Sequence, residues 1–119
     1  MSTEAIRILL HSIEHSQLIR MLSYQGLSGR TALSCCAAHD RYEVIKVILD
    51  IVRDEERHQL LSITDRWMGR TPLHISCVRG DTESVKVMLN HINQDMTYSL
   101  LLTDEKRWRQ YSTTFCNMQ

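Results

Sequence analysis

The residues best suited to chemistry in this chain are its cysteines and histidines, and one such pair lies close in sequence. His74 and Cys77 are three residues apart, so on a helix the thiol and the imidazole could approach each other. No third group is placed to orient the histidine, and Cys77 falls on the helix face that should pack. The chain also lacks a G-x-S-x-G elbow, a glycine-rich phosphate loop and an H-E-x-x-H motif. We therefore expect no enzyme activity and no small-molecule substrate.

The cysteines offer little for a metal or a disulfide. There are four of them, at Cys35, Cys36, Cys77 and Cys116. None forms a C-x-x-C pair, and the ligand spacing of a zinc site is missing, although His39 and His74 leave that alternative open. We expect the cysteines to act as small buried hydrophobes in a reduced compartment, the cytoplasm or also the nucleus. We expect no metal and no cofactor.

The length and the charge of the chain limit which kinds of protein it can be. The 119 residues suit one domain with a modest core. Lys plus Arg equals Asp plus Glu, 14 of each, and a nucleic-acid binder is usually strongly basic, so we expect no nucleic-acid partner. The short basic run around Trp108 is the one alternative. No apolar stretch reaches 18 residues and no secretory signal is present at the N-terminus, so we expect no membrane insertion.

The element that positions His74 and Cys77 is the stretch from Gly69 to Gly80, which is typical of a turn, a helix and a second turn. Gly69 suits a turn that needs positive φ. Thr71 is a good N-cap, Pro72 fits the first helical position, and Gly80 can end the helix in left-handed geometry. A second helix should follow over 83–92. The unit is therefore a pair of short antiparallel helices opened by a turn.

The same unit occurs earlier in the chain. Residues 29–40 match residues 69–80 at a spacing of 40. Three helical stripes of apolar residues follow one spacing pattern: Ile6, Leu9, Leu10 and Ile13; Ile45, Ile48, Leu49 and Val52; Val85, Met88, Leu89 and Ile92. After each stripe comes a polar stretch and then a leucine-rich one. Self-similarity at this period predicts a stacked array in which each unit needs a neighbour.

The motif from Gly69 to His74, followed by Gly80 and the stripe that begins at Val85, resembles an ankyrin repeat. The resemblance covers about residues 26–104, and residues 5–13 match only the outer helix of a preceding unit. It implies an all-α solenoid of antiparallel helix pairs joined by turns. It also implies binding of another protein through the turns and inner helices, no catalysis, and a structural hydrogen bond from His74 near the turn.

Two departures from the family pattern stand out. The usual period is about 33 residues, and here extra length lies at 53–62 and 93–101, which we interpret as a lengthened loop or an extra helical turn. The first full unit has Ala32 and Ser34 in place of proline and histidine, which predicts weaker hydrogen bonding around its turn. We expect a repeat domain over 1–104, with a half repeat at 1–24 and full repeats at about 25–64 and 65–103. Residues 105–119 would form a degenerate or disordered tail.

The expected partner-binding surface combines the turns with the open side of the inner helices. Its residues are Leu27, Arg30, His39, Arg66, Trp67, Met68, Arg70, Val78 and Arg79. The set holds four arginines and no carboxylate, which predicts a basic concave face that prefers an acidic segment, with Trp67 as apolar anchor. Packing of Trp67 in the core is the alternative.

The sequence leaves an alternative to partner binding. The chain could be a structural spacer or a fragment of a longer array in a scaffold or signalling protein. Weak self-association through exposed repeat ends, near Ile6 and Leu9 or near 100–102, is also possible in a short array.

Overall fold

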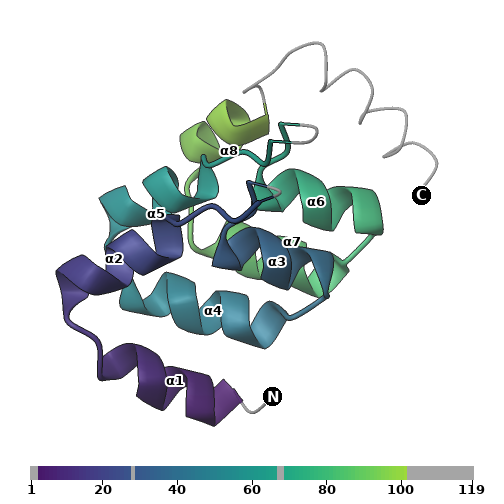
Figure 1. Ribbon diagram of the computed structural model, residues 1–119. Helices are drawn as coiled ribbons and strands as arrows, with labels where there is room; N and C mark the ends of the chain where they lie inside the picture. The colour runs from purple at the N-terminus through teal and green to yellow at the C-terminus, as the bar shows by residue number, and fades with distance from the viewer. Residues whose placement is uncertain (1–2, 28, 67–68, 102–119) are drawn as a thin grey trace.

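The computed structural model describes residues 3–27, 29–66 and 69–101, and every regular element within these ranges is a helix. The prediction of an all-α chain is therefore confirmed. The helices, labelled in Figure 1, are α1 (Thr3–His11), α2 (His15–Ser23), α3 (Ala32–Ala38), α4 (Tyr42–Ile51), α5 (Asp54–Leu61), α6 (Pro72–Arg79), α7 (Thr82–Asn90) and α8 (Gln94–Leu101).

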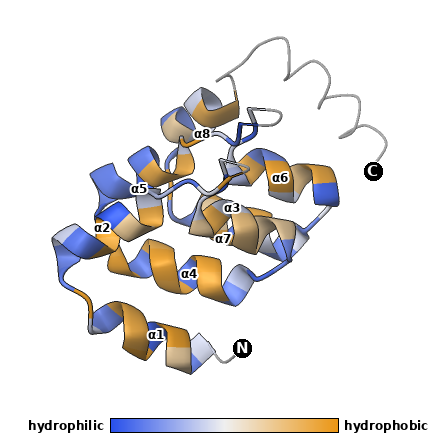
Figure 2. Cartoon of the chain, viewed as in Figure 1, coloured by the Kyte–Doolittle hydropathy of each residue, from blue (hydrophilic) through white to orange (hydrophobic). Residues whose placement is uncertain are grey.

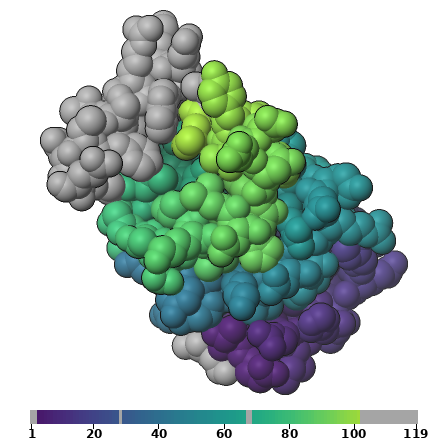
Figure 3. Space-filling model, turned by 180° about the vertical axis from the view of Figure 1, so that it is seen from behind, coloured from purple at the N-terminus to yellow at the C-terminus, as the bar shows by residue number. Residues whose placement is uncertain are grey.

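The helices stack in units that repeat along the chain. Inner helix α3 packs on inner helix α6, and outer helix α4 packs between α1 and α7. Seen from behind in Figure 3, the colours follow the order of the chain from one end of the stack to the other. Contacts between neighbouring units therefore build the domain, as in other solenoids.

Each unit carries a third helix where we expected a lengthened loop or an extra turn. Helices α5 and α8 fill those segments, and α2 holds the same place at the start of the chain. Each of these stretches has a buried leucine: Leu18 in α2, Leu60 in α5 and Leu100 in α8. A helical conformation lets each stretch turn its apolar side chains toward the core. The longer period is thus a three-helix repeat.

The ends of α6 match the sequence prediction. The Thr71 hydroxyl accepts the N–H of His74 at 3.3 Å, and the Thr71 N–H donates to His74 Nδ1 at 3.2 Å. Gly80 ends the helix with φ 73°. In the first full unit Ser34 replaces the histidine, and its N–H and hydroxyl both lie 3.3 Å from the Thr31 hydroxyl. The predicted histidine hydrogen bond is confirmed, and α3 has a simpler cap.

One continuous core runs through the stack. Fully buried side chains come from inner, outer and third helices alike, and include Leu33, Ile45, Leu49, Leu61, Leu73 and Met88. Figure 2 shows many apolar positions on α3, α4 and α6. At the first outer helix the pattern is less complete, because Leu10 is buried but Ile8 and Leu9 are exposed.

Candidate functional site

Two matching turns project ahead of the inner helices, and we call residues 25–30 and 65–70 the two fingers. In the first, the Gly26 N–H donates to the Arg30 carbonyl at 3.2 Å; in the second, the Asp65 N–H donates to the Arg70 carbonyl at 2.9 Å. Gly29 and Gly69 have φ of 78° and 66°, a region that glycine enters without steric cost. The glycine spacing therefore sets the shape of both fingers.

The two fingers are fixed to each other. The side-chain amide of Gln25 donates to the Gly29 carbonyl at 2.8 Å in its own finger and to the Thr64 carbonyl at 2.9 Å beside the second. A Cβ on Gly29 would lie 2.5 Å from both the backbone nitrogen and Cγ of Arg66, so the fingers touch with no room for a larger residue. Side chains on both fingers are therefore held at a fixed separation.

Several predicted contact residues lie open on this surface. Leu27 and Arg66 are exposed and Arg30 is half-buried. Among described residues, neither Arg30 nor Arg66 makes an ion pair. Trp67 and Met68 lie outside the described residues.

At the far ends of the inner helices, the structure brings together residues from successive units. His39 is exposed at the C-terminal end of α3, and Val78 is half-buried near the end of α6. Arg79 reaches back to Asp40, with Nε to Oδ1 and Nη2 to Oδ2 both 3.1 Å. Hydrogen bonding to Arg79 lowers the pKa of Asp40, and the same contact raises the pKa of Arg79.

Two of the four predicted arginines lie beside carboxylates that are not among the predicted contact residues. Arg79 is paired with Asp40. The backbone N–H of Arg70 donates to Asp65 Oδ1 at 3.1 Å. The Nε atom of the Arg70 side chain lies 3.9 Å from Oδ2 of the same buried carboxylate. Asp40 was missed because it belongs to the preceding unit in the chain. The positive charge left open on the fingers comes from Arg30 and Arg66.

The thiol and imidazole that suggested a dyad serve packing and capping. His74 is 4% exposed and Cys77 is 8% exposed. Burial raises the pKa of Cys77 to about 11, so this thiol stays protonated at neutral pH. Burial also lowers the pKa of His74, whose Nδ1 lies 2.9 Å from the Thr71 hydroxyl. Within the described ranges, no group of three His, Cys, Asp or Glu residues could hold a metal ion.

Two further contacts between neighbouring units were not predicted from the sequence. His15 Nε2 lies 2.9 Å from Glu56 Oε2, and His91 Nε2 lies 2.6 Å from Asp50 Oδ1. In each pair the partners are 41 residues apart. A search for opposite charges at about one repeat length would have found them.

A comparison with protein families finds a match in the second full repeat. The family model for the ankyrin repeat matches residues 68–98, which run from the second finger through α6 and α7 into α8. This part of the chain is similar to an ankyrin repeat, and such repeats generally act as protein-interaction modules and are typically not catalytic. No curated protein and no solved structure was found to match it. In the described part of the chain, no helix is long and apolar enough to cross a membrane.

Proposed function

We propose that the chain binds a partner protein through its fingers and the exposed ends of its inner helices. The observation that carries the proposal is that the fingers are locked together by Gln25 while Leu27 and Arg66 point into solvent. Rigid contact residues lose little conformational entropy on binding, so this surface is preorganised. His39 and Val78 extend it toward the far end of the inner helices.

The preferred partner carries an acidic segment that meets Arg30 and Arg66. Of the four arginines expected on the binding surface, only these two are proposed to meet the acidic segment, because Arg70 and Arg79 already have carboxylate neighbours. Charge would mainly speed association, and apolar contacts with Leu27 would supply more of the affinity. Trp67 and Met68 are proposed as further apolar anchors on the second finger, since aromatic side chains often form interface hot spots.

The proposed interacting unit is the repeat domain over 1–104, with its half repeat at 1–24 and full repeats at about 25–64 and 65–103. It acts without catalysis, in a reducing compartment such as the cytoplasm or the nucleus. The three described cysteines are free thiols, which supports such a compartment.

A charge-matched pair of variants tests the proposal. Arg30→Glu with Arg66→Glu reverses the open charge on the fingers. Lys46→Glu with Lys86→Glu makes the same change in net charge on outer helices α4 and α7, where both lysines are exposed. Proteins captured from a lysate by each form would be quantified by mass spectrometry at low and high salt, after circular dichroism shows equal folding.

We expect one or more proteins to be held by the wild type and by the lysine variant but lost with the arginine variant. Their retention should weaken as salt rises, because the charges involved are exposed. Equal capture by all three forms would move the binding site away from the fingers.

A further inference from the structure

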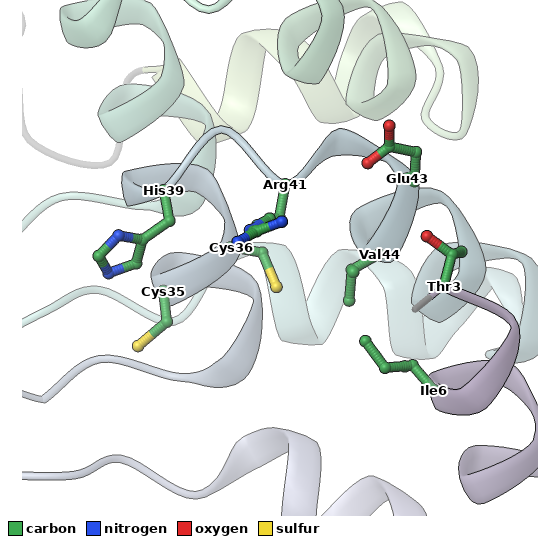
Figure 4. Close-up of a pocket in the computed structure, with 8 residues that line it drawn as sticks. All are labelled: Thr3, Ile6, Cys35, Cys36, His39, Arg41, Glu43 and Val44. Carbon is green, nitrogen blue, oxygen red and sulfur yellow. The ribbon is translucent and has the colours of Figure 1, made fainter. Parts of the chain in front are cut away.

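A groove lies at the first end of the stack, away from the fingertips. It is formed by α1, α3 and the start of α4 and has a volume of about 440 Å³. Figure 4 shows Cys36, Val44 and Ile6 converging on its interior, with His39 and Arg41 near its edge. The lining is thus largely apolar, and its polar border carries His39, Arg41 and Glu43.

The packing of the repeats shows what kind of element fits this groove. Inner helix α3 packs on inner helix α6, and outer helix α4 packs on outer helix α7. One unit earlier, outer helix α1 packs on α4, but within the described residues no inner helix precedes α3. The groove is therefore the place that an inner helix would fill if the stack continued by one more step.

Exposure of equivalent residues supports this placement. Ile75 is 2% exposed and Ser76 is 0% exposed on α6, the helix that α3 packs against. The residues 40 positions earlier are Cys35, which is exposed, and Cys36, which is half-buried. Small and apolar residues thus occupy a face of α3 that is covered in the next unit.

We propose that the groove binds a short α-helix from another polypeptide, with small residues on its buried face and a carboxylate at its C-terminal end. The helix that covers α6 is seven residues long and reads Ala-Leu-Ser-Cys-Cys-Ala-Ala, so small side chains allow the close approach. Asp40 at its end pairs with Arg79. His39 is the equivalent of Arg79 one unit earlier, and with Arg41 it would face the carboxylate of the docked helix.

This site is separate from the proposed function, because its floor lies on α1, α3 and α4 and not on the fingers. His39 borders both surfaces. The test of the groove itself therefore uses Cys35, which lines the groove and is exposed, so a larger residue there should not disturb the core.

The probe is a fluorescein-labelled peptide with the sequence of residues 30–42, its two cysteines replaced by alanine. A hydrocarbon crosslink on its outward side holds it helical, since so short a helix is unstable alone in water. Fluorescence anisotropy with the full chain should show saturable one-to-one binding. Cys35→Arg should weaken binding at least tenfold by filling the groove. Ile8→Arg should leave it unchanged, because Ile8 is 64% exposed on α1 and does not line the groove.

A second pair of measurements tests whether the carboxylate at the C-terminal end of the docked helix contributes to binding. A probe with Lys in place of its aspartate should bind about two- to fivefold more weakly, as expected for an exposed ion pair. The variant His39→Glu should favour the lysine probe over the aspartate probe. Equal affinity of both probes for the wild-type chain would overturn the charge part of the proposal.

Three results would overturn the docking site as a whole. The first is the absence of saturable binding to the wild-type chain, and the second is equal binding to a folded Cys35→Arg variant. The third is a homodimer, seen by sedimentation velocity, that Cys35→Arg dissociates, since a second copy would then fill the groove. Because the finger variant Arg30→Glu, Arg66→Glu keeps the groove intact, it should still bind the probe, and this separates the two proposals.

Discussion

Asp40 and Arg79, 39 residues apart, form a two-point ion pair in which both N···O distances are 3.1 Å. Asp40 holds φ 58° just after α3, which turns its carboxylate toward the last residue of α6. The pair therefore ties the end of one inner helix to the end of the next. It also removes one cation from the surface on which a partner would bind.

The Asp40 titration should report this pair directly. Hydrogen bonding from Arg79 lowers the pKa of Asp40, so Arg79→Gln should raise it toward the ordinary value of about 3.9. In the wild type, the folded state binds fewer protons than the unfolded state. The pair's contribution to stability is therefore complete above the unfolded pKa and is lost as pH falls through the folded pKa. Carboxyl shifts measured by NMR give both values. Lys86→Gln is the control, and an unchanged Asp40 pKa in Arg79→Gln would contradict the prediction.

The two inner-helix caps should differ in strength. Thr71→Ala removes the hydroxyl that accepts the His74 N–H and contacts its ring, and we expect the free energy of unfolding to fall by about 1–2 kcal/mol. Thr31→Ala should cost about 0.5–1 kcal/mol, because Ser34 contributes a weaker set of contacts. Urea unfolding of both variants measures the difference. A larger loss for Thr31→Ala would reverse the proposed ranking.

Gly29 should tolerate no side chain, whereas Gly26 should. Gly29→Ala forces a Cβ into the left-handed region and toward the Arg66 backbone at 2.5 Å, so we expect a loss of about 1–2 kcal/mol from the conformation alone. At Gly26 nothing lies within 4 Å of an added Cβ, so Gly26→Ala should change stability by less than about 0.5 kcal/mol. Thermal unfolding followed by circular dichroism compares them. Similar melting temperatures would show that the fingers are not in fixed contact.

The buried imidazole of His74 should make the fold sensitive to mild acid. Burial is the main cause that lowers its pKa, opposed by a hydrogen bond with the Leu101 backbone. Because the unfolded state takes up a proton first, near its unfolded pKa of about 6.5, the free energy of unfolding should fall as pH decreases from 7 to 5.

The variant His74→Gln isolates that effect. It should be less stable than the wild type at pH 7, because the cap is altered, but should lose less stability between pH 7 and pH 5. His11→Gln, at an exposed site on α1, should keep the wild-type slope. Urea unfolding at the two pH values measures these slopes, and a slope unchanged by His74→Gln would show that another group is responsible.

Much of the repeat was predictable from local sequence. Thr71, Pro72 and Gly80 marked the ends of α6 because caps depend on residues within one turn of each other. The spacing of 40 residues and the apolar stripes predicted the stacking. Gly69 predicted the turn of the second finger, since positive φ is costly for other residues, and the matching stretch 29–40 extended that turn to the first.

Local rules failed where a residue had two possible partners. An aspartate just before a helix is a common N-cap, and Asp40 lies two residues before the start of α4. In the structure Arg41 precedes that helix without a side-chain cap, and Asp40 binds Arg79. The stretch 53–62 was expected to be a loop or an extra turn, and it forms α5 because burial of Leu60 and Leu61 adds to a favourable first turn in which Glu56 accepts the Arg53 N–H.

The sequence by itself determined the helix pair of each repeat, the caps of the inner helices and the resemblance to the ankyrin repeat, because these depend on side-chain periodicity and on hydrogen bonds between residues three or four apart. Only the tertiary structure decided which charges remain open on the fingers and which face of α3 lies uncovered. Both depend on contacts between residues about one repeat apart in the chain, such as Asp40 with Arg79, and stacking alone brings such residues within reach of each other.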